Sequence, residues 1–280
     1  MPLTPTRNST SQPHFLEFNG RRLFALQILP TCPSRGAVLY LPPFAEEMNR
    51  CRSHVAAQAR AFAAAGLRTL ILDPYGTGES DGDIADADWS IWLQDAIAAA
   101  RWLEIESDHA VTLWGMRTGA LLAAEVADSG EVTIPHLLFW QPVLDGKLFL
   151  NQYLRLRIAS QLVNETDRES TEQIRDRLSN GEVIEVAGYP LTSALSENLA
   201  TRRMSDFPAL AHQRISWIEV VSKADQQLSL PSRKLVDALR TQGATVNAET
   251  VACPMIWQLH ERADAPALRD TTLRLFGLEP

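Results

Sequence analysis

The chain has 280 residues, of which 45% are hydrophobic and 21% are charged. This composition excludes a disordered or low-complexity protein and supplies enough apolar residues for one large core. The net charge of −8 argues against a nucleic-acid partner, because nucleic acids are bound by basic surfaces. No stretch of the sequence approaches the roughly 20 consecutive apolar residues of a membrane-spanning helix.

The N-terminus and the cysteines predict where the protein resides. Residues 1–15 are polar and lack the apolar core of a signal peptide. The cysteines Cys32, Cys51 and Cys253 are scattered and odd in number, and none has the C-x-x-C spacing of a metal site. We therefore predict a reduced, cytoplasmic protein that holds neither a metal nor a cofactor.

Predicted strands and helices alternate along the first half of the chain. Residues 1–13 are interpreted as a tail, and Asn19-Gly20 predicts a hairpin between two short strands. Later apolar runs without polar alternation predict strands that are buried on both faces, as in a parallel sheet. The expected strands are 15–18, 22–28, 37–41, 67–73, 110–114 and 137–140, and the expected helices are 52–65, 89–102 and 118–126.

The alternation is interrupted between residues 145 and 207, where the pattern is helical and no convincing strand is found. It then resumes with strands at 215–221 and 245–251, a helix at 232–242 and a final helix whose first turn contains Pro266. Such alternation predicts right-handed β-α-β units and a mainly parallel eight-stranded sheet flanked by helices. The predicted organisation is a tail (1–13), an α/β core (14–144 and 208–280) and a helical cap (145–207) inserted after the sixth strand.

This order of elements resembles the α/β-hydrolase fold. Residues 73–80 (DPYGTGES) resemble the D-x-x-G-x-G-x-S turn that follows the fourth strand of such hydrolases, where it is structural. After the third strand, the resemblance implies a backbone N–H that forms half of an oxyanion hole. Since Pro42 and Pro43 have no N–H, Phe44 is the first residue that can donate, unless the segment is only a tight proline-rich turn. The acidic pair at positions 46 and 47 is interpreted as solvated side chains at the mouth of the pocket.

Residues 112–121 (TLWGMRTGAL) have the glycine spacing of a nucleophile elbow, G-x-S-x-G between a strand and a helix, but the central residue is Arg117. A guanidinium is always protonated and has no lone pair, so Arg117 cannot act as a serine-type nucleophile. Its presence either abolishes covalent catalysis or creates an anion receptor, because arginine and a helix N-terminus both bind carboxylate or phosphate. The backbone N–H of Thr118 is the second oxyanion donor that the resemblance implies.

Two residues match the remaining catalytic positions of the fold. Asp225 follows the strand 215–221, where the fold places its acid, although a loop or capping aspartate is the alternative. His260 lies in the loop after the last strand but later than the usual spacing, and Trp257 is nearer the expected position of the histidine. Cys51, at the start of the first long helix, is a further candidate nucleophile, but a packed thiol is the preferred interpretation.

Three longer segments resemble one α/β-hydrolase subfamily, the exosortase A system-associated hydrolases of type 2. They are residues 41–50 (LPPFAEEMNR), 114–123 (WGMRTGALLA) and 140–147 (WQPVLDGK), the last extended by 149–156. The resemblance implies a bacterial, cytoplasmic protein encoded near the machinery for exopolysaccharide production and for sorting PEP-CTERM proteins. It implies no settled substrate.

Three functions remain open from the sequence. The first is an ester or thioester hydrolase acting on an acyl- or sugar-linked substrate, in which Asp225 and His260 activate water. The second is an inactive hydrolase scaffold that binds an anionic ligand through Arg117. That hypothesis requires that no carboxylate neutralises the guanidinium, whereas an arginine locked to an acid would be structural. The third is a scaffolding protein that presents residues 145–207 to a protein partner.

Overall fold

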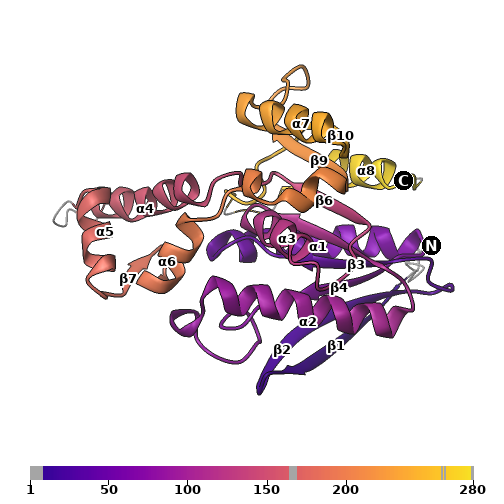
Figure 1. The fold of residues 1–280 in the computed structure, drawn as a ribbon, viewed down its shortest axis with the longest axis horizontal. Coiled ribbons are helices and arrows are strands. Elements are labelled where there is room, and N and C mark those ends of the chain that lie inside the picture. The colour runs from indigo at the N-terminus through magenta and orange to yellow at the C-terminus, as the bar shows by residue number, and fades with distance from the viewer. Residues whose placement is uncertain (1–8, 164–168, 260, 262, 279–280) are drawn as a thin grey trace, which may run out of the picture.

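The computed structural model describes residues 9–163, 169–259, 261 and 263–278. Its centre is an eight-stranded sheet in the order β1-β2-β4-β3-β5-β6-β9-β10 (Figure 1). The pairs β1-β2 and β2-β4 are antiparallel, and the other five pairs are parallel. The prediction of a mainly parallel eight-stranded sheet is therefore confirmed.

The elements have the following bounds. The strands are β1 (Ser9–Phe18), β2 (Arg21–Pro30), β3 (Ala37–Leu41), β4 (Arg68–Leu72), β5 (Val111–Met116), β6 (His136–Trp140), β7 (Ile184–Val186), β8 (Tyr189–Leu191), β9 (Arg214–Val221) and β10 (Thr245–Ala252). The α-helices are α1 (Glu46–Ala64), α2 (Trp89–Ser107), α3 (Thr118–Asp128), α4 (Gly146–Val163), α5 (Thr171–Ser179), α6 (Ser193–Ala200), α7 (Leu230–Gln242) and α8 (Pro266–Leu275). Short 3₁₀ helices are η1 (Ile84–Asp86), η2 (Met204–Asp206) and η3 (Pro208–His212).

The parallel strands are buried on both faces, as their continuous apolar runs predict. In β3, Val38 and Tyr40 face the core layer beneath α1 and α8, whereas Leu39 and Leu41 face the layer that holds α2 and α3. All five residues of β3 and all five of β6 are buried. Because successive side chains alternate across a strand, only a run without polar interruptions can fill both layers.

The N-terminal hairpin is longer than predicted. Asn19 and Gly20 have φ values of 48° and 74° and form its turn, which confirms the hairpin. However, β1 begins at Ser9, which pairs with Pro30. The interpretation of residues 1–13 as a tail is thus wrong for 9–13, which belong to the sheet. The sequence gives no strand signal for residues 9–13, because their side chains are mostly polar and exposed. They lie in β1, an edge strand whose outer face meets solvent.

The described residues between β6 and β9 form three α-helices, the 3₁₀ helices η2 and η3, and one small hairpin, β7-β8 (Figure 1). The expectation of no strand there is wrong, since Ile184–Val186 pairs antiparallel with Tyr189–Leu191. The hairpin turn uses Ala187 and Gly188 at positive φ, and strands of three residues are too short to show periodicity. The buried side chains of α4 and α6 join the same hydrophobic cluster as α2 and α3.

Candidate functional site

The loops after β3 and β5 meet at the carboxyl edge of the sheet, where Leu41 pairs with Gly115. Two glycines make this approach close. A Cβ atom on Gly119 would lie 2.2 Å from the carbonyl oxygen of Leu41, and one on Gly115 would lie 2.4 Å from the carbonyl oxygen of Gly119. No side chain fits at either position, which is the physical reason for the glycine spacing around Arg117.

Arg117 occupies the tip of this turn, between β5 and α3, with φ 55° and ψ −117°. This backbone region is strained for a residue with a side chain, at a cost of about 1–3 kcal/mol. Three hydrogen bonds hold the peptide groups in place. The Arg117 N–H donates to the Trp140 carbonyl at 3.0 Å, and its carbonyl accepts from the N–H groups of Ala120 and Val143, each at 3.1 Å.

The Arg117 guanidinium forms an ion pair with Glu47 of α1. The Nε atom lies 3.3 Å from Oε1 and 3.2 Å from Oε2, and Nη2 lies 3.1 Å from Oε1. Only 14% of the arginine side chain and 17% of the glutamate side chain are exposed. Burial raises the pKa of Glu47, and the adjacent guanidinium opposes that rise. The interpretation of Glu47 as a solvated side chain is therefore wrong.

Aromatic rings complete the surroundings of the guanidinium. Its central carbon lies 5.1 Å from the ring centroid of Trp257 and 5.8 Å from that of Phe149, within the range of cation–π attraction. Trp257 is buried in the loop after β10, and Phe149 belongs to α4. An indole ring donates one hydrogen bond and accepts none, so Trp257 cannot take a proton from a nucleophile.

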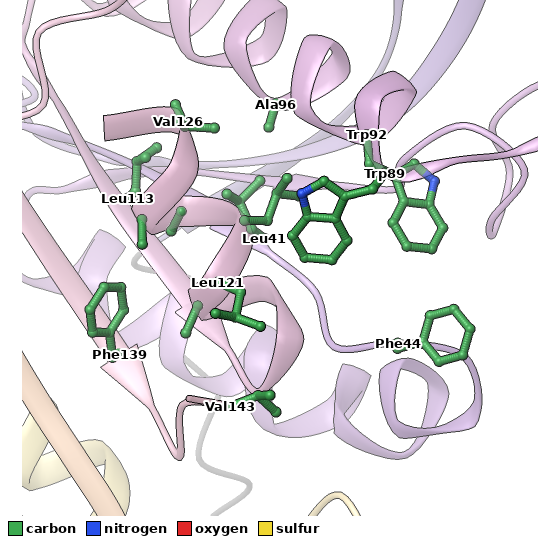
Figure 2. Packing of buried hydrophobic residues seen from close by; sticks show 14 of the residues in the cluster. Leu41, Phe44, Trp89, Trp92, Ala96, Leu113, Leu121, Val126, Phe139 and Val143 are labelled. Atoms are coloured by element: carbon green, nitrogen blue, oxygen red, sulfur yellow. The ribbon is translucent and has the colours of Figure 1, made fainter. Parts of the chain in front are cut away.

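A small pocket lies beside the elbow, lined by Phe44, Ala45, Thr118, Gly119 and the indole rings of α2. Figure 2 shows Phe44 on the loop after β3 and the rings of Trp89 and Trp92 on α2. The pocket measures about 20 Å³, the space for one water molecule or one ligand oxygen. The N–H groups of Phe44 and Thr118 donate to no other described residue, so both are free to bind such an oxygen.

Two further contacts bring distant segments to the elbow. Arg50 of α1 donates to the Gln258 carbonyl at 2.7 Å and pairs with Glu46 at 2.9 Å, which fixes the loop that carries Trp257. Asn49 donates to the Tyr189 hydroxyl at 2.7 Å, which joins α1 to β8. In addition, the Phe44 ring packs edge-on against the rings of Phe149 and Tyr153 in α4.

Several solved structures share this architecture. One holds Est1E from Butyrivibrio proteoclasticus with ferulic acid bound, at 18% identity and a TM-score of 0.65, over 94% of this chain and 95% of that one. DcsB in complex with its substrate analogue is 15% identical, with a TM-score of 0.62, over 96% of this chain and 99% of that one. The thioesterase domain from the curacin biosynthetic pathway is 17% identical, with a TM-score of 0.51, over 86% of this chain and 94% of that one. No family model and no curated protein sequence matches the chain.

The chain has the α/β-hydrolase fold. Its strand order, in which the chain crosses from β4 past β3 to β5, and the tight turn after β5 place Arg117 where this fold presents its nucleophile. At such low identity, the likeness to solved structures establishes the architecture and leaves the chemistry to the residues themselves.

The described residues do not assemble the acid and base of a hydrolase triad. Asp225 is exposed in the loop after β9 and makes no hydrogen bond or ion pair with another described residue. The predicted partner His260 lies outside the described residues. The buried carboxylate of this region is Glu219, which accepts from the Ser229 N–H at 2.7 Å and thereby fixes the start of α7.

The structure also accounts for the other candidate groups near the elbow. Cys51 is fully buried against the sheet, and burial raises its thiol pKa, which agrees with a packed thiol. Among the described residues, no three of His, Cys, Asp or Glu lie close enough to hold a metal ion. None of the described helices is both long and apolar enough to cross a membrane.

Sequence reasoning missed Glu47 because the first helix was expected to start at residue 52. It starts at Glu46. Within the helix, Glu47 lies four residues before Cys51 and eight before Val55, both on the buried face. That spacing places Glu47 on the face of the helix that packs against the sheet.

Proposed function

We propose that this α/β-hydrolase-fold protein binds a small, uncharged acyl compound at the elbow and does not cleave it through an acyl-enzyme intermediate. The observation that carries the proposal is Arg117 at the tip of the elbow, ion-paired to Glu47. The fold keeps the strained turn and both free N–H groups, but a guanidinium replaces the attacking hydroxyl. Such an arrangement supports recognition of a carbonyl group and excludes attack on it by the residue at the elbow.

The geometry of the ion pair supports an uncharged ligand. A guanidinium has five N–H donors, and Glu47 faces the edge formed by Nε and Nη2. The Nη1 group makes no hydrogen bond with a described residue, so it remains available to an acceptor. Because the pair has no net charge, it attracts a free anion weakly, and a carbonyl oxygen suits it better. This replaces the hypothesis that Arg117 is an uncompensated anion receptor.

We further propose that residues 145–207 act as a cap over this site. The cap contributes Phe149, which contacts both Arg117 and Phe44, and Tyr153, which packs on Phe44. Its hairpin is joined to α1 by the Asn49–Tyr189 hydrogen bond. The carbonyl oxygen of a ligand would enter the small pocket beside the elbow, and its acyl group would lie outside that pocket, against the aromatic rings of the cap and Trp257 of the core.

The sequence resemblance supports a cellular context for the same ligand. Segments 41–50 and 114–123 hold both members of the Arg117–Glu47 pair, and these are segments that resemble the exosortase-associated type 2 hydrolases. We propose that the ligand is an acyl- or sugar-linked ester or thioester of cytoplasmic exopolysaccharide synthesis. Among the solved structures with this fold, one holds Est1E with ferulic acid bound and another is a thioesterase domain from the curacin biosynthetic pathway.

A hydrolase that uses activated water is the alternative enzyme. It would require Asp225 and His260 to act as a base pair, and it would retain the ester or thioester as substrate. A scaffolding role for residues 145–207 toward a protein partner is the non-ligand alternative. The same experiment separates all three functions.

The experiment uses purified full-length protein and a matched pair of probes, ethyl butyrate and butyrate, which share a chain and differ in charge. Calorimetry should show saturable binding of the ester and at least tenfold weaker binding of butyrate. Arg117→Met should weaken ester binding by about tenfold through the loss of a charge-assisted hydrogen bond. Arg101→Met is the control, since Arg101 pairs with Glu131 on the surface and both side chains are half exposed. With p-nitrophenyl butyrate and butyryl-CoA, turnover should equal the background.

Each contrary result has a distinct meaning. Turnover that His260→Ala or Asp225→Asn removes would overturn the proposal in favour of the water-activating hydrolase. Binding of butyrate as tight as that of the ester would restore the anion receptor. Binding of neither probe by correctly folded protein would leave the scaffolding role.

A further inference from the structure

A second cavity lies away from the elbow, between α1 and the face of the sheet formed by β2, β3 and β4. It measures about 180 Å³. Its walls are mostly apolar and include the rings of Phe24 and Tyr40 and the side chains of Leu26, Val55 and Ile71. An apolar protein cavity of roughly 150 Å³ binds benzene, so this one has the size for a single six-membered ring with a short substituent.

One charged pair of side chains, Arg52 and Asp73, belongs to the lining. The Arg52 Nη2 atom lies 3.1 Å from Asp73 Oδ1, and the Arg52 Nε atom donates to Asn49 Oδ1 at 3.3 Å. Asp73 is buried, with 3% of its side chain exposed, whereas 41% of the Arg52 side chain is exposed. Arg52 thus marks the side of the cavity that opens to solvent, and its Nη1 group makes no hydrogen bond with a described residue.

We propose that this cavity binds an uncharged, benzene-sized molecule that carries one hydroxyl or carbonyl group. The ring lies among the apolar side chains, where its transfer from water is favourable. Its oxygen accepts a hydrogen bond from Arg52 Nη1, and a hydroxyl can in turn donate to the carboxylate of Asp73. An anionic ligand is disfavoured because it would place a second negative charge beside Asp73, whose charge already balances that of Arg52.

The cavity is separate from the site of the proposed function. Its lining includes neither Arg117 nor Glu47, and it shares only Pro42 and Met48 with the pocket beside the elbow. Those two residues form the wall between the two spaces. Methionine side chains change conformation readily, so a ligand in the cavity could shift Met48 and thereby alter the pocket beside the elbow. Binding to the cavity itself does not depend on the elbow.

The test compares three probes with one ring: benzyl alcohol, toluene and benzoate. Titration calorimetry of the full chain should give the tightest binding for benzyl alcohol and at least tenfold weaker binding for benzoate. Ala56→Phe places a ring in the cavity, because Ala56 is part of its lining, and should abolish binding of all three. Arg52→Met should weaken benzyl alcohol by about tenfold and leave toluene within twofold. Arg60→Met is the control on the same helix, since Arg60 is exposed and has no ion pair with a described residue.

A thermal melt of each variant checks that it is folded, and Ala56→Met replaces Ala56→Phe should the larger residue prevent folding. Unchanged benzyl alcohol binding in a folded cavity-filling variant would overturn the proposal, and so would the absence of saturable binding to wild type. Loss of binding in Arg117→Met, with Ala56→Phe unaffected, would place the probe at the elbow instead. Failure of the elbow proposal alone leaves these results unchanged.

Discussion

Two residues at the candidate site have strained backbone conformations. Arg117 has φ 55° and ψ −117°, and Ala45 at the start of α1 has φ 53° and ψ −128°. Each conformation costs about 1–3 kcal/mol. In a hydrolase that strain exposes a serine, whereas here it sets a guanidinium against Glu47. In this protein the strained turn therefore positions the Arg117–Glu47 pair and the backbone N–H groups beside it.

The first prediction concerns the stability of that pair. Arg117→Met removes the partner of a largely buried carboxylate, and we expect the free energy of unfolding to fall by about 3 kcal/mol. The double variant Arg117→Met with Glu47→Gln should recover most of this loss, because no unpaired charge remains. Urea denaturation monitored by circular dichroism measures both values. Equal stability of the single and double variants would contradict a role for Glu47 as the compensating charge.

The second prediction concerns His136, the first residue of β6, which is buried and lies 2.9 Å from the hydroxyl of Ser216. Burial lowers its pKa to about 4, and the nearby Arg214 acts in the same direction. The unfolded chain, with a histidine pKa of about 6.5, then binds the proton more readily than the folded one. The contribution of neutral His136 to the free energy of unfolding is consequently complete above pH 6.5. It is lost as the pH falls from 6.5 to 4, by up to about 3 kcal/mol.

Urea denaturation at pH 7 and pH 4.5 tests this for wild type and for His136→Gln. Glutamine keeps a hydrogen-bonding group next to Ser216 but does not titrate, so the variant should lose less stability on acidification. The same acid-induced loss in both proteins would assign the effect to other groups.

The helices and strands with long apolar runs or clear capping residues could be predicted from the sequence. Those whose formation depends on packing against other elements could not. The parallel strands and the helices α2, α3 and α7 lie close to their expected positions because periodicity and flanking glycines act locally. The first six residues of α1, 46–51, precede its expected start because Glu46 and Glu47 look like a polar loop, although acidic residues suit a helix N-terminus. The hairpin β7-β8 was missed because three-residue strands depend on packing against α4 and α5.

The third prediction concerns the junction between α1 and the small hairpin. Among the described residues, the Asn49–Tyr189 hydrogen bond links them directly, at 2.7 Å. Tyr189→Phe removes it and should speed amide hydrogen exchange in residues 184–191, with a loss of local stability of about 1 kcal/mol. Asn49→Ala also removes the hydrogen bond from Arg52 Nε, but its effect on residues 184–191 should match that of Tyr189→Phe. The double variant should add little more there, because both changes break the same interaction with the hairpin. Full additivity of the two effects would show that this bond does not hold the hairpin.

For the whole molecule, local sequence spacing predicted the architecture, whereas the site depends on contacts between segments far apart in the chain. The turn at 73–80 and the glycines around Arg117 are short motifs, so the sequence displays them directly. Glu47 and Arg117 are 70 residues apart, and Trp257 is a further 140 residues along the chain. No single segment shows that these three side chains converge, and only the assembled sheet and its loops bring them together.

The last prediction asks whether this scaffold is otherwise able to form an acyl-enzyme. Arg117→Ser restores a hydroxyl to the elbow, but Trp257 stands nearer than His260 to the expected position of the catalytic histidine and offers no lone pair. We therefore expect the single variant to stay within about threefold of background hydrolysis of p-nitrophenyl butyrate. Adding Trp257→His supplies a base close to the new serine, and intact-mass spectrometry should then detect a butyryl adduct. Turnover by Arg117→Ser alone, removed by His260→Ala, would show instead that His260 reaches the elbow and that only the nucleophile had been lost.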